Sequence, residues 1–222
     1  GTGQATEPML DLGATITAIE LGAEMAAHLR DRLGHRHIDV IVGPFEDVDV
    51  APGSFDLVAS ATAFHWVPPE AGMVRAHAAL RPGGWLALWW SVFGDPSRPD
   101  PWHDAIQPLL REHAPVLIDE PGAGNPSVGV YHYGLDVESR VAAFADHGGF
   151  GPVHHDVVPW TGRHTAAGIR AMFASFSPWL ALEPEVREPL LDALEALADD
   201  AFDGVVERPY LTASYVAQRV DG

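Results

Sequence analysis

Four short and almost continuously apolar runs constrain the fold of this chain most, because they alternate with helical patterns along its amino-terminal part. The runs are ATITAIE (14–20), IDVIVG (38–43), FDLVASA (55–61) and WLALWWS (85–91). A strand that is covered on both faces has no polar side to alternate with, and such runs are typical of parallel sheets. We therefore predict an α/β fold with a doubly wound, mostly parallel sheet and helices on both faces.

Helix candidates fill the intervals between these runs, and each is followed by residues that stop a helix. They cover 4–12, 23–33 and 69–80, followed by Gly13, Gly34 and the RPGG turn at 81–84. Glycine accepts the left-handed conformation at a helix end, and proline is tolerated in a first turn. Further along we expect helices at 102–113, 137–147, 166–176 and 185–202, and strands at 153–160 and 210–219.

The composition changes between Phe93 and Tyr133, where Pro, Gly and His accumulate. We interpret this stretch as a small lid inserted over the carboxyl edge of the sheet. With 222 residues and 47% hydrophobic content, the chain can bury one full core. We predict a single domain over 1–222, with a ligand-binding core at 1–91, the lid at 93–133, and the elements that complete the sheet at 136–222.

The charge balance argues against nucleic acid as a partner. The formal net charge is −18, from 31 acidic and 13 basic residues, and Lys and Arg are nowhere gathered into a stripe. Affinity for nucleic acid is built from clustered cations. The chain has no cysteine, which excludes disulfides and thiolate sites and is compatible with a cytoplasmic location. Since no apolar run approaches the roughly 20 residues that cross a bilayer, we expect no membrane association.

A glycine pair and a strand-end acid form a nucleotide-binding pattern. Gly1-Thr2-Gly3 leads directly into the first helix candidate, and Glu20 ends the strand that follows. Glycine lets the backbone approach a ligand closely, while a carboxylate at a strand end can accept hydrogen bonds from both hydroxyls of a ribose. Either feature alone is weak, but their order and spacing together indicate a ribose contact.

Five segments then carry a resemblance to a known family. GTGQAT, ITAIE, VGPFEDVDV, SFDLVASATAFHW and LRPGGWLAL follow one another as the motifs of class I S-adenosylmethionine-dependent methyltransferases do. The chain resembles in particular the small-molecule branch similar to trans-aconitate methyltransferase, closely over residues 1–91. The resemblance implies a Rossmann-like fold, S-adenosyl-L-methionine as cofactor, and methyl transfer to an O, N or C atom of a small metabolite.

The resemblance also implies cofactor-binding positions, although it does not transfer the identity of the substrate. The positions are Gly1, Thr2 and Gly3 for the methionine and ribose part, Glu20 for the ribose hydroxyls, Leu21, Phe45 and Glu46 around the adenine, and the small residues Ser60 and Ala61 near the methionine group. Many relatives carry an acid at the position of Pro44, so either Glu46 or main-chain groups would recognise the adenine edge here.

Four aromatic or imidazole side chains are candidates for substrate contact. His65 and Trp66 follow the third apolar run, near the expected methyl group, and His65 is the candidate catalytic residue because histidine can act as a base near neutral pH. The alternative is that Trp66 packs on the sheet while His65 bonds a loop, and a carboxylate acceptor would need no base. Tyr131 and Tyr133 of the expected lid would line the acceptor pocket or pack the insertion.

The twelve histidines do not indicate a metal site. His154 and His155 are adjacent on a strand candidate, so their side chains point to opposite faces. His35 and His37 lack a third ligand at suitable spacing. We therefore predict no bound metal.

Two alternatives and one expectation remain open. A nicotinamide-dependent oxidoreductase also uses glycines and a strand-end acid, although GTGQAT lacks the third glycine of the usual G-x-G-x-x-G. A catalytically silent domain with the same fold is the other alternative. The family places a first strand immediately before the residues that match Gly1–Gly3, so we expect upstream residues in the natural protein and poor cofactor binding by the 222 residues alone.

Overall fold

The computed structural model describes residues 1–119 and 132–220, and the contacts between Cα atoms divide the chain into two compact units. As far as it is described, the first unit comprises Gly1–Trp90, Asp136–His155 and Ser214–Gly222, and the second comprises Ser91–Leu135 and Asp156–Ala213. A single domain with a lid at 93–133 stays a prediction.

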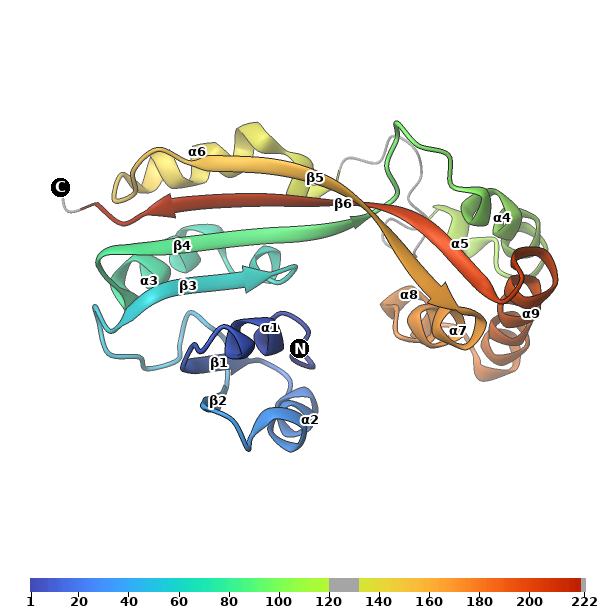
Figure 1. Ribbon diagram of the computed structural model, residues 1–222, viewed down its shortest axis with the longest axis horizontal. Helices are drawn as coiled ribbons and strands as arrows, with labels where there is room; N and C mark the ends of the chain where they lie inside the picture. The colour runs from blue at the N-terminus through green and yellow to red at the C-terminus, as the bar shows by residue number, and fades with distance from the viewer. Residues whose placement is uncertain (120–131, 221–222) are drawn as a thin grey trace. The chain divides into compact units, whose positions relative to one another are not determined.

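The first unit begins with two helices and a pair of parallel strands (Figure 1). Their order is α1 (Thr6–Asp11), β1 (Ile16–Glu20), α2 (Ala23–Leu33) and β2 (Ile38–Val42). The register runs from Ile16 opposite Ile38 to Glu20 opposite Val42. The buried side chains of Leu10, Leu29 and Leu33 pack against the inward residues of both strands. The carboxyl ends of β1 and β2 therefore lie side by side, as the apolar runs predict.

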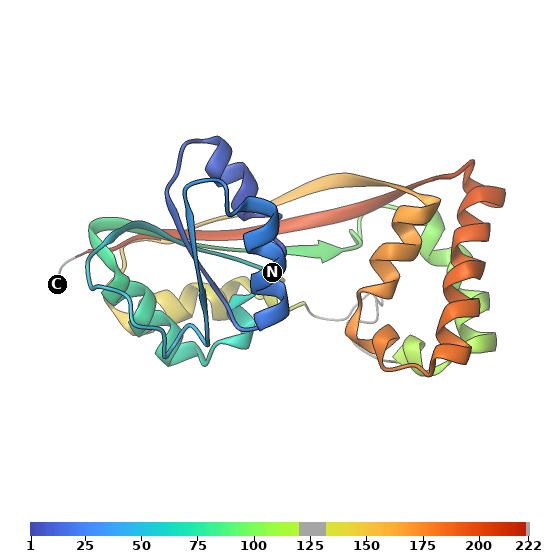
Figure 2. The same cartoon turned by 90° about the horizontal axis from the view of Figure 1, so that it is seen from below.

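A second sheet has the strand order β3-β4-β6-β5. Its strands are β3 (Phe55–Ala61), β4 (Leu80–Phe93), β5 (His154–Thr165) and β6 (Val205–Gln218). β3 and β4 pair in parallel, while β6 runs in the opposite direction in Figure 1. The helices α3 (Pro69–Ala79) and α6 (Val137–His147) lie together on one face of this sheet (Figure 2).

The described residues thus form two sheets where the sequence predicts one. β1 pairs only with β2 and β3 pairs only with β4, so each of them is an edge strand in the described part of the chain. An edge strand leaves a row of backbone N–H and C=O groups that a further strand can pair with. The parallel, helix-covered architecture is nevertheless the one that the apolar runs predict.

Several strand boundaries differ from the prediction, and two of them lie next to turn signals. β4 begins at Leu80, so the turn predicted at 81–84 is an excursion inside the strand: β3 advances from Phe55 to Leu57 while β4 advances from Leu80 to Trp85. β6 begins at Val205 rather than at 210, directly after the glycine turn that follows the long acidic helix. In both places strand pairing continues through residues that local turn signals would exclude.

The second unit packs its helices around one apolar cluster. They are α4 (Pro101–His113), α5 (Val116–Asp119), α7 (Ala166–Ala174), α8 (Ser177–Leu180) and α9 (Pro184–Phe202). Two short 3-10 turns complete the described elements, at Phe64–Trp66 in the first unit and at Tyr133–Leu135 in the second. Trp102, Phe173 and Trp179 lie at the centre of the cluster with Leu191 and Leu194 of α9. The apolar face of α9 is therefore buried, as its helical spacing predicts.

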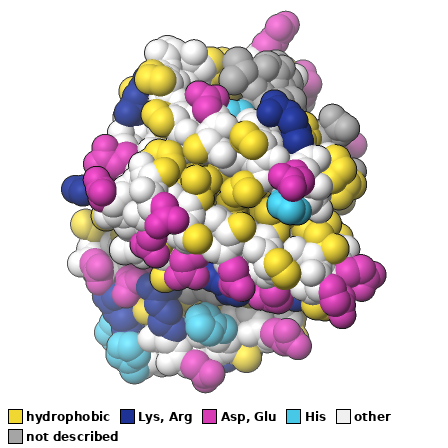
Figure 3. All heavy atoms as spheres, turned by 90° about the vertical axis from the view of Figure 1, so that its right-hand side faces the viewer, with side chains coloured by type: hydrophobic (Ala, Val, Ile, Leu, Met, Phe, Trp, Pro, Cys, Tyr) yellow, Lys and Arg dark blue, Asp and Glu magenta, His cyan; other side chains and the backbone are white. Residues whose placement is uncertain are grey.

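The acidic side chains that outnumber the basic ones lie on the surface of the molecule. On the face drawn in Figure 3, acidic side chains are spread widely, and the basic ones stand in small groups among them. Several apolar side chains of the second unit are also exposed, among them Val116, Leu180 and Val186.

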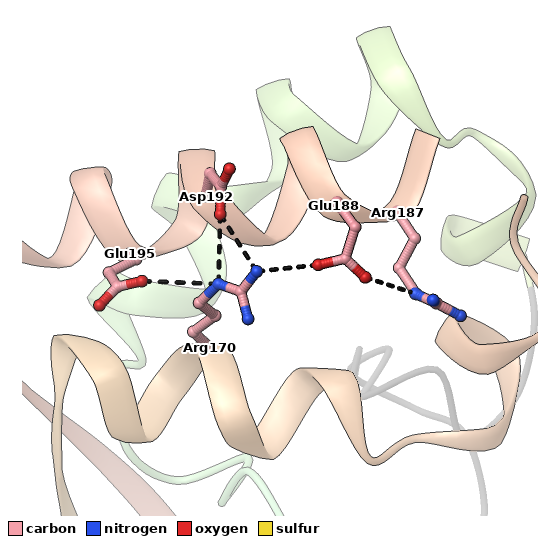
Figure 4. A network of polar contacts seen from close by, with 5 residues as sticks. All are labelled: Arg170, Arg187, Glu188, Asp192 and Glu195. Atoms are coloured by element: carbon pink, nitrogen blue, oxygen red, sulfur yellow. Dashed lines mark hydrogen bonds and ion pairs between the residues drawn. The ribbon is translucent and has the colours of Figure 1, made fainter. Parts of the chain in front are cut away.

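Arg170 joins α7 to α9 through a network of ion pairs (Figure 4). Its guanidinium lies 2.8 Å from Glu188, 3.2 Å from Asp192 and 3.5 Å from Glu195, and Arg187 contacts Glu188 at 3.1 Å. Hydrogen bonds from Arg187 and then from Arg170 lower the pKa of Glu188. The network is exposed, so solvent and salt screen it.

We expect Arg170→Met to lower the midpoint of thermal unfolding at low ionic strength, with a difference that shrinks at about 1 M salt, where the screening length falls to about 3 Å. Because the pKa of Glu188 is depressed in the folded state, this stabilisation is present above its unfolded pKa and is lost as the pH falls through the folded one. Arg163→Met, which removes a single exposed pair with Glu207, is the control. A loss that is independent of both salt and pH would contradict the electrostatic origin.

Candidate functional site

The glycine loop at the start of the first unit is built around Gly3. This residue is buried with φ +94°, and a Cβ added to it would lie 2.8 Å from Leu29 and 2.9 Å from Leu33. Both leucines belong to the core that α2 packs against β1 and β2. Only glycine fits this backbone conformation and this close approach. The loop is held from the other side by Arg32, which donates to the carbonyl oxygen of Thr2 at 2.9 Å.

Glu20 ends β1 beside that loop, as its position in the sequence predicts. One carboxylate oxygen accepts a hydrogen bond of 2.8 Å from the main-chain N–H of Gly22, and the other contacts the nitrogen of Gly1. The side chain is 17% exposed. The structure thus brings together the glycines and the strand-end acid that the sequence pairs only by spacing. The carboxylate keeps lone pairs for further donors, because each oxygen can accept more than one hydrogen bond.

The loop after β2 lies at the same strand ends. The N–H of Gly43 donates to the carbonyl oxygen of Glu20 at 3.1 Å, which joins the ends of the two strands. Phe45 and Glu46 follow in a turn closed by bonds from Asp47 and Val48 to the Pro44 carbonyl, and both side chains are half-buried.

Phe45 and Leu21, two of the residues predicted to contact adenine, lie in different environments. The ring of Phe45 packs against Phe64 at a centroid distance of 6.4 Å. Leu21 is 69% exposed next to Glu20, an apolar side chain left open at the strand ends. Phe45 is therefore in part a packing residue, the alternative role for an aromatic in this loop, and its backbone stays available at the turn.

The end of β3 contains a backbone strain that its composition does not reveal. Ser60 and Ala61 are half-buried and small. Thr62 follows with φ +48°, an uncommon conformation for a residue with a branched side chain. Its N–H donates to the carbonyl oxygen of Trp89 at 2.8 Å, which holds this conformation in place. Such residues persist only where the surroundings enforce them, and they cluster at functional sites.

His65 is held by a partner on the neighbouring strand. The indole N–H of Trp90, a buried residue of β4, donates to Nδ1 of His65 at 3.1 Å. A neutral imidazole that accepts at Nδ1 carries its proton at Nε2. Desolvation of the part of the ring that is covered lowers the pKa of His65, which favours the neutral form. In this tautomer the Nε2 atom is a hydrogen-bond donor and not a base.

Trp66 does not pack on the sheet. Its side chain is 80% exposed, and its ring lies 5.1 Å from the ring of His65. The interpretation of Trp66 as a buried packing residue is therefore wrong, and an open aromatic surface lies beside His65. Trp90 is the functional residue that sequence reasoning missed: only its place on the strand next to the end of β3 could have pointed to it.

The other two candidates lie elsewhere. Tyr131 falls outside the described residues. Tyr133 lies in the second unit, in a short 3-10 turn, and its side chain is half-buried. Among the described residues no group of three or more His, Asp or Glu side chains could hold a metal ion. None of the described helices is both long and apolar enough to span a bilayer.

The amino-terminal part of the chain is similar to known methyltransferases. The family described as "Methyltransferase domain" matches residues 1–88. An uncharacterized methyltransferase of Mycobacterium tuberculosis (strain H37Rv) is 33% identical over 92 residues, which are 41% of this chain and 37% of that protein. The matched region thus spans less than half of the length of this relative.

Solved structures show the same fold over the whole chain. A proposed type II methyltransferase from Anaeromyxobacter dehalogenans aligns with 100% of this chain and 88% of its own, at a TM-score of 0.64 and 18% identity. Phosphoethanolamine N-methyltransferase 2 of Haemonchus contortus, solved with phosphomonomethylethanolamine and S-adenosylhomocysteine, aligns with 99% of this chain and 46% of its own, at a TM-score of 0.54 and 14% identity.

We expect Gly3→Ala to destabilise the protein more than Gly13→Ala. Both glycines have positive φ, but a Cβ at Gly13 meets nothing within 4 Å, whereas one at Gly3 meets two core leucines. The backbone cost of about 1–2 kcal/mol is shared, and overpacking adds about 1–3 kcal/mol at Gly3 alone. Denaturant unfolding measures the difference. Equal losses for the two variants would show that the Gly3 cradle is not tightly packed.

We expect Trp90→Phe to raise the pKa of His65 toward its ordinary value. The substitution removes a donor that bonds only the form with an unprotonated Nδ1, so the neutral ring loses its advantage. NMR titration of the imidazole Cε1 proton measures the shift. Trp85→Phe on the same strand, whose ring contacts His154, is the matched control and leaves the titration of His65 in place. No shift in Trp90→Phe would mean that the indole does not fix the tautomer.

Proposed function

We propose that the protein transfers a methyl group from S-adenosyl-L-methionine to an O, N or C atom of a small metabolite, since residues 1–88 match the family described as "Methyltransferase domain" and the whole chain shares the fold of solved methyltransferases. The observation that carries this proposal is the place of Glu20 at the carboxyl end of β1, beside the loop after β2 and with its carboxylate oriented by the N–H of Gly22. Ligands of open α/β sheets bind at these strand ends.

The residues present fit the adenosyl part of this cofactor. Gly3 has a positive φ and no room for a Cβ against Leu29 and Leu33, so the loop keeps a backbone conformation that only glycine allows. Glu20 is held in place by the N–H of Gly22, and its remaining lone pairs can accept from two ribose hydroxyls. Phe45, Glu46 and the exposed Leu21 lie on the same strand ends and supply the contacts proposed for adenine.

The cofactor supplies an electrophilic methyl group on a sulfonium sulfur. What the chain itself must do is orient the acceptor in line behind that methyl group and exclude water, since alignment accounts for much of such a rate enhancement. The strained turn at Thr62 fixes the loop that carries His65 and Trp66. His65, neutral with its proton on Nε2, donates a hydrogen bond to the acceptor, and the open ring of Trp66 provides an apolar surface beside it.

A role for His65 as a donor differs from the role of a general base that histidine often has. In the tautomer fixed by Trp90, Nε2 has no lone pair to take a proton. The acceptor that fits this arrangement is one that reacts in its deprotonated form, because a carboxylate or a free amine needs no base at the moment of transfer.

The remaining functional assignments rest on composition. The acidic balance of the chain, 31 acidic against 13 basic residues, supports a small metabolite over nucleic acid as the substrate. The absence of cysteine is in keeping with a cytoplasmic location, which we retain as part of the proposal.

The proposal is tested by titrating the natural protein, with the upstream residues expected above included, with S-adenosylhomocysteine in a calorimeter. We expect Glu20→Gln to weaken binding by about tenfold or more, because a neutral amide replaces charge-assisted hydrogen bonds worth about 1.5–3 kcal/mol. Glu24→Gln, which neutralises an exposed acid in the first turn of α2, is the matched control and binds as the parent does.

A parallel thermal-shift experiment with NAD separates the methyltransferase from an oxidoreductase. Stabilisation by NAD in place of S-adenosylhomocysteine would overturn the proposed cofactor. Unchanged affinity in Glu20→Gln would overturn the ribose contact.

A further inference from the structure

The loop that joins β2 to β3, residues 43–54, contains the side chains proposed to contact adenine, and its far end is anchored on α3. The N–H groups of Gly53 and Ser54 donate to the carbonyl oxygens of Ala78 and Ala79, the last two residues of the helix, at 2.8 and 3.0 Å. A loop whose ends alone are fixed keeps conformational freedom in its middle. The conformation of the middle therefore depends on further contacts.

Arg75 of α3 supplies such a contact. Its Nη2 donates to the main-chain carbonyl oxygen of Val48. Val48 is buried, and its own N–H closes the turn on the carbonyl oxygen of Pro44 at 3.2 Å. Among the described residues, the bond from Arg75 is the one hydrogen bond that reaches residues 44–52 from outside the loop. It fixes the turn from a helix that follows much later in the chain.

This bond engages the backbone and leaves the acids of the loop unpaired. Glu46, Asp47 and Asp49 all lie near the turn, yet the described part of the chain contains no ion pair between any of them and Arg75. Nε of Arg75 is also buried without a hydrogen-bond partner in that part. An unfilled buried donor is costly, so a residue that served stability alone would fill it. The carboxylate of Glu46 remains able to accept a hydrogen bond from the exocyclic amino group of adenine.

The same face of α3 contacts the turn that contains His65. Gly72 lies three residues before Arg75, and residues at this spacing share one face of a helix. A Cβ at Gly72 would lie 2.9 Å from the ring of Phe64, which in turn packs against Phe45 in the loop. All of these residues belong to the first unit. One face of α3 therefore contacts both the proposed adenine loop and the turn of the substrate candidates.

We propose that Arg75 is a positioning residue for the recognition of adenine. By holding the carbonyl of Val48, it keeps the 43–54 loop in the conformation that presents Glu46 and main-chain groups to the edge of the base. This proposal rests on the methyltransferase function proposed above. Without the bond the loop adopts other conformations, and cofactor affinity falls with the fraction that is competent to bind. Selectivity for adenine falls too, because a site discriminates through polar groups held opposite those of its ligand.

The test titrates Arg75→Met, Arg75→Lys and the parent, each as the natural protein with its upstream residues, with S-adenosylhomocysteine and with S-inosylhomocysteine in a calorimeter. In the second ligand a carbonyl oxygen replaces the exocyclic amino group. We expect Arg75→Met to weaken binding of S-adenosylhomocysteine by about fivefold or more and to bring the affinities for the two ligands closer together. Arg75→Lys should recover most of both, since an ammonium group can still donate to a carbonyl.

Arg30→Met is the matched control. Arg30 of α2 also donates from its guanidinium to a main-chain carbonyl, that of Val40, but this acceptor lies within β2 and not in the loop. The control should therefore bind both ligands with the affinities of the parent.

Amide hydrogen exchange of the ligand-free protein measures the order of the loop directly. We expect the N–H groups of Asp47 and Val48, which close the turn on Pro44, to exchange faster in Arg75→Met while the amides of β1 exchange as in the parent. If Arg75→Met loses protection throughout and is unfolded, Arg75→Gln decides the question. Its amide nitrogen ends two bonds short of the position of Nη2, so it should show the same loss of selectivity.

The two ligands separate a positioning role from a merely structural one. Unchanged affinity and selectivity in a folded Arg75→Met or Arg75→Gln would overturn the proposal and leave the proposed function in place. An equal loss of affinity for both ligands would overturn it as well, and so would a parent that does not distinguish them. A parent that binds no S-adenosylhomocysteine would overturn the proposed function and the adenine role of Arg75 with it, even if hydrogen exchange shows that Arg75 orders the loop.

Discussion

The parallel pairing of β1 with β2 is the constraint on which the candidate site depends. It places the end of β1 against the loop after β2, where the N–H of Gly43 bonds the carbonyl oxygen of Glu20. The helices α1 and α2 pack their leucines on these strands, and the same leucines leave space for nothing larger than glycine at position 3. Core packing and ligand-binding geometry are therefore set by the same few side chains. A change in the apolar face of α2 would alter the loop as directly as a change in the loop itself.

The discontinuity between the two sheets is the main departure from a complete doubly wound sheet. β1 and β3 are both edge strands in the described part of the chain, and both belong to the first unit. Parallel sheets are normally continuous and covered, since unpaired backbone groups favour association with another strand.

The polar interactions of the two units differ in kind. In the first, hydrogen bonds orient the carboxylate of Glu20 and hold the imidazole of His65. In the second, a buried cation is held by one carboxylate and keeps donors to spare. Exposed ion pairs such as those of Arg170 join helices to each other, whereas the buried pair of Arg208 joins β6 to Asp100, the residue that caps α4.

The sequence by itself determined the secondary structure and the residues of the nucleotide-binding pattern. Apolar runs, glycine stops and proline starts are local signals, so they predict α2 with its bounds at 23–33 and the position of Glu20 at the end of β1. Tertiary structure alone decided what depends on neighbours distant in the chain. The donor that fixes His65 comes from Trp90 on another strand, and the exposure of Trp66 and the strain at Thr62 follow from how that loop is held. The partner of Asp100 is Arg208, which lies 108 residues further along the chain. No local sequence pattern predicts this contact, because only the packing of strands and helices brings the two residues together.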